Sequence, residues 1–417
     1  MNFADLTPAR AACYARERGL FAPGASLHVH EIGFSEGEGF VNHLYKVWDD
    51  SGKALIIKQA KPYLSYWGPR EFVPVSVSRS LIEANAIILR TSITPDAILP
   101  VVLVDSENNL FVQECWQRPS VRTWWRQGVW LPEFPAQIGK YVARNAFYTS
   151  EIFLDIDAHR QLAGAFMNSS MRSLMEGILF SFEDLHPVEG MFDSIEDFRP
   201  ALFADSSLCC ELLALRDVYT KRTECLVHGD LHTSNIMYED SRMVVFDMEY
   251  AHMGAYSTDL GYLLGNFISP YLAMPYRRDL PKDQRVDFGR RVLAAMSTVV
   301  DTFLEEFRSL WEAHAKPMYR SAPEYFPYVF SDLVPNVVGL AGVQLLGRVV
   351  NPGADQDYDP IRDPEEHEEL RHLTLAVGMA LVKGHRELRT MKEACALIES
   401  VASGFHAAKA RKARVLP

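Results

Sequence analysis

The spacing of apolar positions along the chain changes near residue 116. Before that point, short apolar runs alternate with turn residues, a pattern that predicts β-strands. Two helices accompany the strands, one that begins at Pro8 behind a Thr7 cap and one over 78–90. The predicted strands are 28–33, 42–48, 54–60, 101–105 and 110–115. The first 116 residues therefore predict a compact five-stranded lobe.

After residue 116 the apolar positions recur mostly at helical spacing. The clearest predicted helices are 135–149, 285–307, 334–349 and 391–413. One interruption, 226–247, predicts a loop followed by a tight hairpin in which 236–238 pairs with 243–246. We therefore predict an α+β protein with a protein-kinase-like two-lobe fold. It consists of a small five-stranded β-rich N-lobe (1–116) and a larger, mostly helical C-lobe (117–417).

Composition narrows the class of protein. The chain has 417 residues, 48% of them hydrophobic, which is enough for a large core and excludes a disordered chain. With 42 basic and 54 acidic residues the net charge is −12, which argues against a nucleic-acid-binding protein. Charged residues interrupt the N-terminal segment, so no signal peptide is expected, and no apolar run is long enough to predict a membrane span. Six cysteines without metal-type spacing fit a reduced, cytoplasmic enzyme.

The segment from His228 to Asn235 carries the strongest chemical signal. It fits H-x-D-x-x-x-x-N, the catalytic-loop pattern of kinase-like phosphotransferases. In this pattern Asp230 meets the acceptor hydroxyl, while Asn235 turns back towards a metal ion on the nucleotide phosphates. Asp247 and Glu249 follow across the predicted hairpin and offer the hard oxygen ligands that Mg²⁺ prefers. Taken singly, these residues also fit a turn and a solvated charge pair, but their combination after a β-rich lobe favours a metal-dependent kinase.

The N-lobe supplies candidate groups for binding ATP. Gly37 and Gly39, with Asn42, lie between two predicted strands, where glycine lets backbone amides approach phosphates; a plain turn is the alternative. Lys58 is a charge inside an apolar strand, and Glu83 on the following predicted helix is its candidate partner. In kinases such a pair aims the lysine at the α- and β-phosphates. A lysine that points outward from its strand is the alternative.

The end of the last predicted strand is the candidate adenine-binding edge. Gln113, Glu114 and Cys115 lie where the linker of a kinase offers backbone groups to adenine. In the C-lobe, we expect His232 to hold the catalytic loop rather than to act on the acceptor. The acidic residues that follow residue 350, Asp357 among them, are expected to form a solvated loop.

These motifs resemble those of the methylthioribose kinase family, within the wider superfamily of aminoglycoside phosphotransferases and choline kinases. The family's H-G-D-L-H-T-G-S-I is similar to His228–Ile236, and its D-P-E-F-A is similar to Asp247–Ala251. Its V-V-K-Q-A-L-P-Y resembles Ile56–Tyr63, and its G-F-D-I-G-x-x-x-x-N resembles the segment from Ser257 to Asn266. The resemblance extends over about residues 5–390.

The resemblance implies an ATP- and Mg²⁺-dependent sugar kinase that forms a homodimer. It implies that the acceptor is the 1-hydroxyl of 5-methylthioribose and that the reaction belongs to methionine salvage. Of the family's twin arginines near the sugar, only Arg348 has a counterpart here, because Gly347 occupies the other position. Arg348 is therefore the expected sugar contact. Three alternatives remain open: a kinase for another 5-modified pentose such as 5-deoxyribose, an aminoglycoside or choline-type kinase, and a nucleotide-binding protein without turnover.

Overall fold

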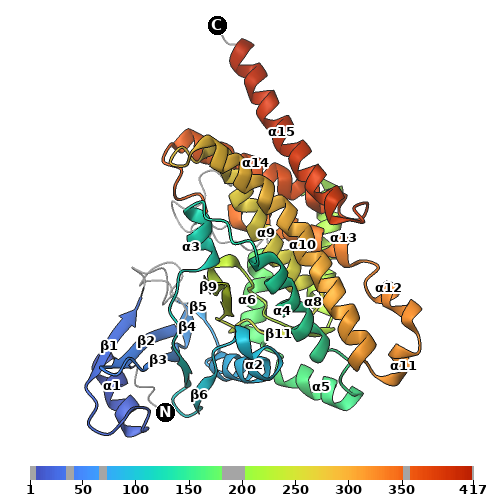
Figure 1. The fold of residues 1–417 in the computed structure, drawn as a ribbon. Coiled ribbons are helices and arrows are strands. Elements are labelled where there is room, and N and C mark those ends of the chain that lie inside the picture. Colours follow the sequence, from blue (N-terminus) through green and yellow to red (C-terminus); the bar gives the residue numbers. More distant parts are fainter. Residues whose placement is uncertain (1–5, 34–41, 65–72, 181–201, 351–356, 416–417) are drawn as a thin grey trace.

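The computed structural model of the protein describes residues 6–33, 42–64, 73–180, 202–350 and 357–415. The chain forms a small lobe built on a β-sheet and a larger helical lobe, with its termini at opposite ends of the molecule (Figure 1). The predicted α+β class with a β-rich N-lobe and a helical C-lobe is therefore confirmed. The division at residue 116 falls between the last strand of the sheet and the first helix of the C-lobe, and it stays a prediction as a domain boundary.

The sheet of the N-lobe is antiparallel throughout, with the strand order β1-β2-β3-β7-β6. Its strands are β1 (Leu27–Ile32), β2 (Asn42–Asp49), β3 (Ala54–Ala60), β6 (Val101–Asp105) and β7 (Leu110–Glu114). All the predicted strands are confirmed to within one residue at each end. A separate short ladder pairs β4 (Tyr63–Leu64) with β5 (Val73–Pro74).

Helices cover both faces of this sheet. On one face, Ala11 of α1 (Pro8–Glu17) packs in a cluster with Val47 and Val112. On the other face, Phe111 is buried with residues of α2 (Arg79–Ile93), because neighbouring residues of a strand point to opposite sides. The α2 cluster continues into the core of the C-lobe, so the two lobes share one main core.

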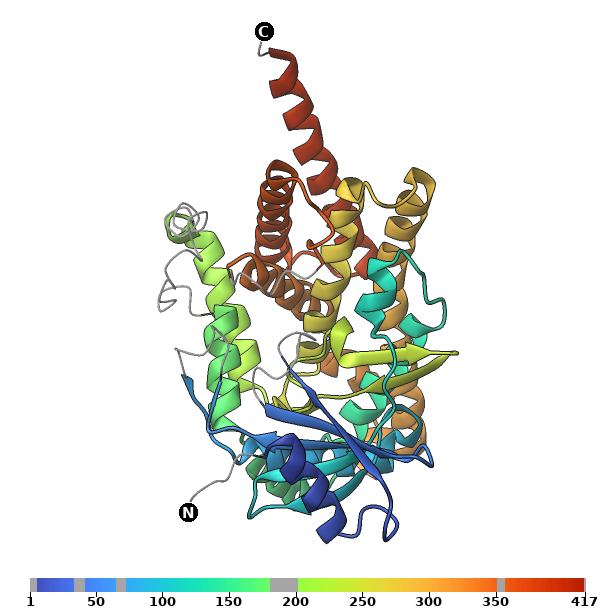
Figure 2. The same cartoon turned by 90° about the vertical axis from the view of Figure 1, so that its left-hand side faces the viewer.

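The C-lobe is a stack of helices that stands above the sheet (Figure 2). At its centre α9, α13 and α14 pack against one another, and α10 packs along α4. The helices are α3 (Val121–Arg126), α4 (Phe134–Tyr148), α5 (Ile156–Ala165), α6 (Ser169–Phe180), α8 (Ser206–Lys221), α9 (Ser257–Ala273), α10 (Lys282–His314), α11 (Pro317–Arg320), α12 (Phe326–Val329), α13 (Leu333–Val350), α14 (Pro364–Gly384) and α15 (Met391–Val415). The four clearest predicted helices are confirmed as α4, α10, α13 and α15. Periodicity does not reveal α9, because this helix is buried on nearly every side and carries no polar stripe.

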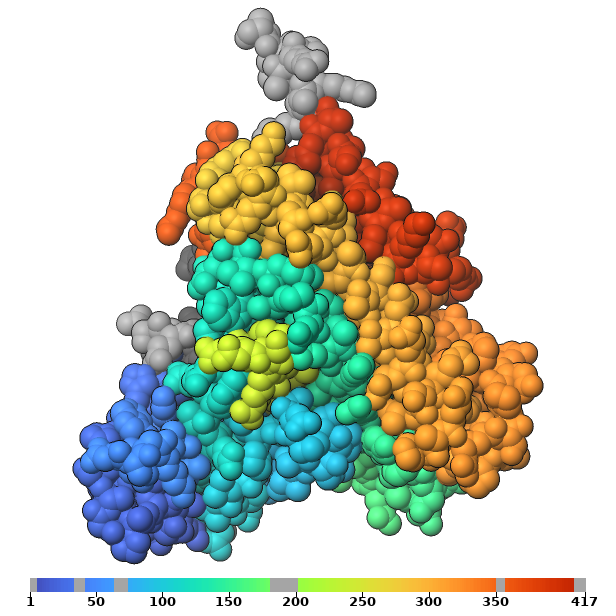
Figure 3. Space-filling view, in the orientation of Figure 1, coloured from blue at the N-terminus to red at the C-terminus, as the bar shows by residue number. Residues whose placement is uncertain are grey.

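Two short ladders interrupt the helices and position the predicted catalytic segments. The hairpin of β9 (Ile236–Glu239) and β10 (Arg242–Val245) confirms the prediction, and it reaches the surface of the C-lobe (Figure 3). In the second ladder, which the sequence does not predict, β8 (Cys225–Val227) pairs with β11 (His252–Gly254). The predicted catalytic loop begins directly after β8, and the Asp247–Glu249 segment ends just before β11. Because β8 pairs with β11, the start of the catalytic loop and the end of the Asp247–Glu249 segment lie next to each other.

One stretch among the described residues, Pro323–Val349, is long and apolar enough to cross a membrane by length and composition alone. In the structure, 78% of its most apolar window is buried inside the protein. Most of this stretch is α13, which packs against α9 and α14. The stretch is therefore apolar because it forms a helix in the core of the C-lobe.

The close approach of α9 and α13 predicts a cost for any side chain at Gly261. A Cβ atom there would lie 2.5 Å from the Leu340 Cβ and 3.1 Å from the Val337 carbonyl oxygen. We expect Gly261→Ala to lower the free energy of unfolding by roughly 1–3 kcal/mol through overpacking, measured by urea denaturation. Gly164→Ala in α5 is the control, since a Cβ there meets nothing within 4 Å and should leave stability unchanged or raised. Equal effects of both substitutions would contradict this prediction.

Candidate active site

The catalytic loop is anchored by its first two backbone amides. The Asp259 carboxylate, at the start of α9, accepts hydrogen bonds from the His228 amide (2.7 Å) and the Gly229 amide (3.0 Å). Gly229 has a φ of 82°, and a Cβ on this residue would lie 2.3 Å from the Tyr250 carbonyl oxygen. Only glycine therefore fits at this position, where the loop passes against the segment before β11.

Two histidines orient Asp230 within the loop. The Nδ1 atoms of His228 and His232 accept hydrogen bonds from the amides of Asp230 (3.3 Å) and Ser234 (3.2 Å). In that tautomer Nε2 of His232 carries a proton and faces the Asp230 carboxylate at 3.4 Å. Burial raises the pKa of Asp230, but His232, His228 and the Tyr262 hydroxyl outweigh it and lower the pKa below its ordinary value. Asp230 is therefore an anion at neutral pH, and His232 contacts it as expected of a loop-holding residue.

The catalytic loop is bonded directly to the segment that carries Asp247. The Phe246 amide donates to the Asn235 carbonyl oxygen (3.1 Å), and His228 Nε2 donates to the Phe246 carbonyl oxygen (2.9 Å). The Asn235 side chain turns back and donates to the Asp230 carbonyl oxygen (3.1 Å). Asp247 follows with a φ of 66°, a left-handed conformation that is uncommon outside glycine and that is found at functional sites.

Lys58 lies between two carboxylates from different lobes. Its Nζ atom is 2.8 Å from Glu83 Oε1 and 2.5 Å from Asp247 Oδ1. The predicted Lys58–Glu83 contact is therefore present, and the outward-pointing alternative is wrong. Burial lowers the pKa of Lys58, but Asp247, Glu83 and Glu249 outweigh it and raise the pKa above its ordinary value. The lysine is held as a cation.

Glu249 is buried in a polar network with N-lobe residues. Its Oε2 atom accepts a hydrogen bond from Asn42 Nδ2 (2.8 Å) and lies 3.6 Å from Arg79 Nε. Burial and then Asp247 raise the pKa of Glu249 above its ordinary value. On the other side of the segment, Asn168 Nδ2 donates to the Glu249 carbonyl oxygen (2.7 Å) and holds its backbone in place.

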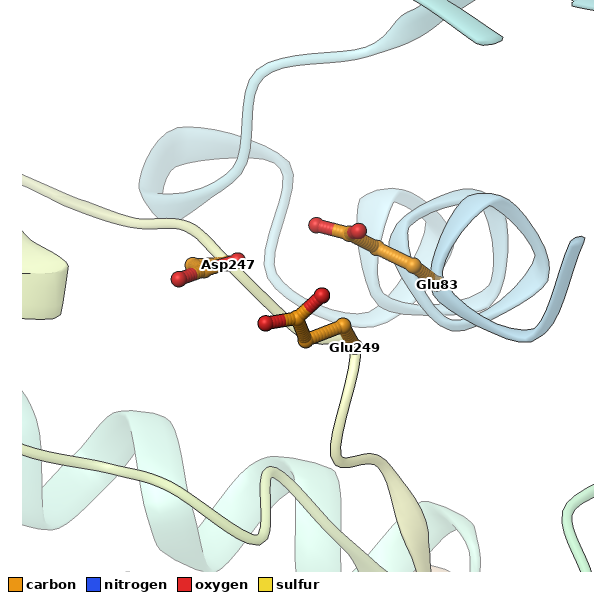
Figure 4. A group of neighbouring side chains, drawn as sticks. All are labelled: Glu83, Asp247 and Glu249. Atoms are coloured by element: carbon orange, nitrogen blue, oxygen red, sulfur yellow. The ribbon is translucent and has the colours of Figure 1, made fainter. Parts of the chain in front are cut away.

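Glu83, Asp247 and Glu249 form a group that fits a divalent cation. Each can place one carboxylate oxygen so that all three oxygens lie within 4.8 Å of one another, and Figure 4 shows the carboxylates turned towards a common point. Carboxylate oxygens are the ligands that Mg²⁺ prefers. The predicted ligands Asp247 and Glu249 belong to this group together with Glu83. The role of Asn235 as a further ligand stays a prediction.

The predicted nucleotide-binding residues are only partly described. Gly37 and Gly39 lie outside the described residues. At the predicted adenine edge, the Gln113 side chain donates to the Leu99 carbonyl oxygen (2.9 Å). The amides of Glu114 and Cys115 donate to the carbonyl oxygens of Pro100 (3.1 Å) and Ala54 (3.3 Å). The binding of adenine at this edge therefore stays a prediction.

Arg348 lies in a second buried ionic cluster, within the C-lobe. Its guanidinium donates to Asp357 Oδ2 (3.1 Å) and to the Asn266 side-chain oxygen. Arg122 of α3 contacts the same two residues, at 3.3 Å from Asp357 Oδ1 and 2.8 Å from Asn266 Oδ1. Asp357 is buried between the two arginines, so the expectation that it belongs to a solvated loop is wrong. Asn266 is one turn along α9 from Tyr262, the neighbour of Asp230, so α9 connects this cluster to the catalytic loop.

Several residues that build the site were not predicted from the sequence. Arg79 is four positions before Glu83, and the helical period puts both on one face of α2, so the spacing was a usable signal. Asp259 lies inside the segment from Ser257 to Asn266, but nothing in its neighbours indicates that it binds the loop amides. For Asn168 and Arg122 we find no signal in the sequence, because their partners are remote along the chain.

The chain is similar to several known proteins. Residues 195–298 match the model of the phosphotransferase enzyme family. A methylthioribose kinase of Bacillus cereus (strain ATCC 10987 / NRS 248) is 30% identical over 391 residues, which cover 92% of this chain and 94% of that protein. A methylthioribose kinase of Bacillus mycoides (strain KBAB4) is 29% identical over 389 residues, with the same coverage of 92% and 94%. Among solved structures, an ethanolamine kinase of Plasmodium vivax has a TM-score of 0.49 at 13% identity and covers 88% of this chain and 87% of that one.

Burial of His252 beneath the catalytic loop predicts a pH dependence of stability. Its Nδ1 atom bonds the Tyr250 carbonyl oxygen (2.9 Å), and burial lowers its pKa to about 4. As the pH falls from about 6.5, the unfolded chain takes up the proton first, so stability declines until about pH 4, by at most about 1.4 kcal/mol per pH unit. We expect His252→Asn to flatten the fall in unfolding free energy between pH 7 and pH 5, measured by urea denaturation. The exposed His372→Asn is the control, and an unchanged slope in the His252 variant would refute the assignment.

Proposed function

The chain belongs to the methylthioribose kinase family, and from that premise we propose that it transfers the γ-phosphoryl group of ATP to the 1-hydroxyl of 5-methylthioribose. One observation supports this function best. The Phe246 amide donates to the Asn235 carbonyl oxygen and the Phe246 carbonyl oxygen accepts from the His228 ring, and these two hydrogen bonds hold the catalytic loop beside the segment that carries Asp247. An acceptor-side carboxylate and a phosphate-side ionic cluster are thereby fixed next to each other.

On the phosphate side, the residues of the chain fit ATP bound with Mg²⁺. Lys58, held by Glu83, provides a fixed positive charge for the α- and β-phosphates. Asp247 and Glu249 would hold the Mg²⁺ ion, with Glu83 beside them, and Asn235 is the further ligand that the catalytic-loop pattern predicts. When bound, the ion neutralises charge on the phosphates and helps to orient them. Gly37, Gly39 and Asn42 are proposed to lie over the phosphates, and Gln113, Glu114 and Cys115 to lie along adenine.

On the acceptor side, Asp230 is proposed to orient the sugar hydroxyl and to accept its proton as the phosphoryl group is transferred. Its anionic state suits this role, because a protonated carboxyl could not take the proton. His232 contacts the Asp230 carboxylate through Nε2 and the Ser234 amide through Nδ1, so it helps to fix the direction of the carboxylate. Positioning and electrostatic stabilisation supply most of the catalysis in such a site.

The sugar is assigned from the family and from the cluster on the acceptor side. Arg348 is proposed to contact the sugar, and its bonds to Asp357 and Asn266 would fix the direction of its guanidinium. The family resemblance also supports three broader proposals: a place in methionine salvage, a cytoplasmic location and a homodimer.

We expect Asp230→Asn to abolish most turnover while the protein stays folded and still binds ATP. The amide keeps the size of the side chain but cannot accept the proton, a contribution worth about 10²–10⁴-fold in rate. An ADP-coupled assay measures turnover, and calorimetry measures ATP binding. Asp240→Asn, in the exposed turn of the β9–β10 hairpin, is the matched control. A kcat close to that of the wild type in the Asp230 variant would remove Asp230 from this role.

We expect the wild type to prefer 5-methylthioribose over 5-deoxyribose, ribose and choline in kcat/KM. Arg348→Ala should raise the KM for the sugar about 10–150-fold and change the KM for ATP much less, because a charged hydrogen bond is worth roughly 1.5–3 kcal/mol. Arg371→Ala is the control, since Arg371 bonds the Val349 carbonyl oxygen (3.1 Å) outside the cluster. A preference for ribose or choline would refute the substrate. An equal change in both KM values would refute the role of Arg348 and leave the kinase assignment in place.

A further inference from the structure

Arg79 lies at the first position of α2 and is among the most deeply buried charged residues of the described chain, with an exposed fraction of 1%. Among the described residues, its guanidinium reaches three groups. Nη1 donates to the Ser76 carbonyl oxygen (2.9 Å), Nη2 donates to Asn42 Oδ1 (3.2 Å), and Nε lies 3.6 Å from Glu249 Oε2. Burying a guanidinium costs free energy that an anionic partner offsets, and Glu249 is such a partner for Arg79.

Arg79, Asn42 and Glu249 form a closed ring of polar contacts. The Asn42 oxygen accepts from Arg79, and the Asn42 nitrogen donates to Glu249 Oε2 (2.8 Å). The charges at the two ends determine this orientation, because the reversed amide would face a cation with its donor and an anion with its acceptor. The ring therefore holds Oε2 of Glu249 by two groups from the N-lobe.

The ring joins the parts of the site that bind the nucleotide and the ion. Asn42 is the first residue of β2 and directly follows the segment that contains Gly37 and Gly39. Glu249 comes from the C-lobe and belongs to the group of carboxylates that fits a divalent cation. Arg79 and Glu83 are one turn apart on the same face of α2. The Arg79 cation contacts Glu249, and the Glu83 anion contacts Lys58.

We propose that Arg79 is a positioning residue for the metal–nucleotide complex. It acts through Glu249 and Asn42: it occupies Oε2, leaves the other carboxylate oxygen to face the ion, and fixes the distance between the ion-binding carboxylates and the start of β2. This inference rests on the proposed function, because it assumes that Mg²⁺ and ATP bind at this cluster.

The geometry depends on the planar fork of the guanidinium and not on positive charge alone. Lysine has one ammonium nitrogen and cannot reach Ser76, Asn42 and Glu249 from one position in the same plane. Arg79→Lys therefore keeps the charge and loses the ring. A residue that only stabilised the fold would lower the melting temperature on substitution without altering the requirement for the ion.

The same helix offers a matched control. Arg90 of α2 also has an exposed fraction of 1%. It donates to the Tyr141 hydroxyl (2.8 Å) and the Leu226 carbonyl oxygen (3.0 Å), and neither of these residues contributes a carboxylate to the candidate ion site. Arg90→Lys removes an equally buried guanidinium from the same helix. Asp247→Ala is the positive control for loss of ion-dependent binding.

The experiment measures ATP binding by calorimetry over a range of Mg²⁺ concentrations, together with the melting temperature of each protein. We expect Arg79→Lys to raise the Mg²⁺ concentration for half-maximal binding at least about tenfold, as the loss of a charged hydrogen bond predicts, while Arg90→Lys leaves it unchanged. Asn42→Ala should shift it in the same direction. The double variant that combines Arg79→Lys with Asn42→Ala should raise this Mg²⁺ concentration by a smaller factor than the product of the two single factors.

Two results would overturn the inference. If Arg79→Lys and Arg90→Lys lower the melting temperature alike and leave the Mg²⁺ requirement unchanged, Arg79 is only structural. If the shifts of Arg79→Lys and Asn42→Ala multiply independently, the ring does not act as a unit. Failure of the proposed function is distinguishable from both, because the wild type itself would then show no Mg²⁺-dependent binding of ATP and would match Asp247→Ala.

Discussion

Buried charges of opposite sign, placed where α2 meets the segment before β11, hold the phosphate side of the site together. Lys58 and Arg79 face Glu83, Asp247 and Glu249, so the group has one carboxylate more than it has cations. A charge in a protein interior costs several kcal/mol unless a partner of opposite sign compensates it. Each member of the group therefore depends on the others, and a bound cation would offset the burial and the neighbouring Asp247 that raise the pKa of Glu249.

Packing fixes the elements that carry these charges. The buried face of α2 belongs to the main core of the C-lobe, although the helix follows the N-lobe sheet in sequence. The β8–β11 ladder holds the ends of the catalytic loop and of the Asp247–Glu249 segment, and Asp259 binds the first amides of the loop. Because packing already orders these segments, the ionic contacts do not have to compensate for the conformational entropy that is lost when the chain is ordered.

The two sides of the site are built differently. On the phosphate side, Lys58 and Arg79 of the N-lobe contact carboxylates of the C-lobe. These contacts therefore depend on how the two lobes are positioned relative to each other. On the acceptor side, Arg122, Arg348, Asp357 and Asn266 all come from the C-lobe. A Cβ at Gly347 would lie 3.4 Å from the Ile178 carbonyl oxygen, so position 347 faces α6 and not the cluster around Arg348.

The strands of the sheet, the main amphipathic helices, the catalytic-loop pattern and the Lys58–Glu83 contact could be predicted from the sequence. These features depend on short-range patterns: alternation in a strand, the helical period, and the spacing of His228, Asp230 and Asn235. Only the folded structure shows the partners of Arg79, Arg122 and Asn168, the burial of Asp357, and the position of Glu83 beside Asp247 and Glu249. The β8–β11 ladder and α9 belong to the same class, since a three-residue strand and a helix buried on all sides carry no periodic signal. In each case the contact joins segments remote along the chain, and the packing of whole elements, not local spacing, determines which remote groups meet.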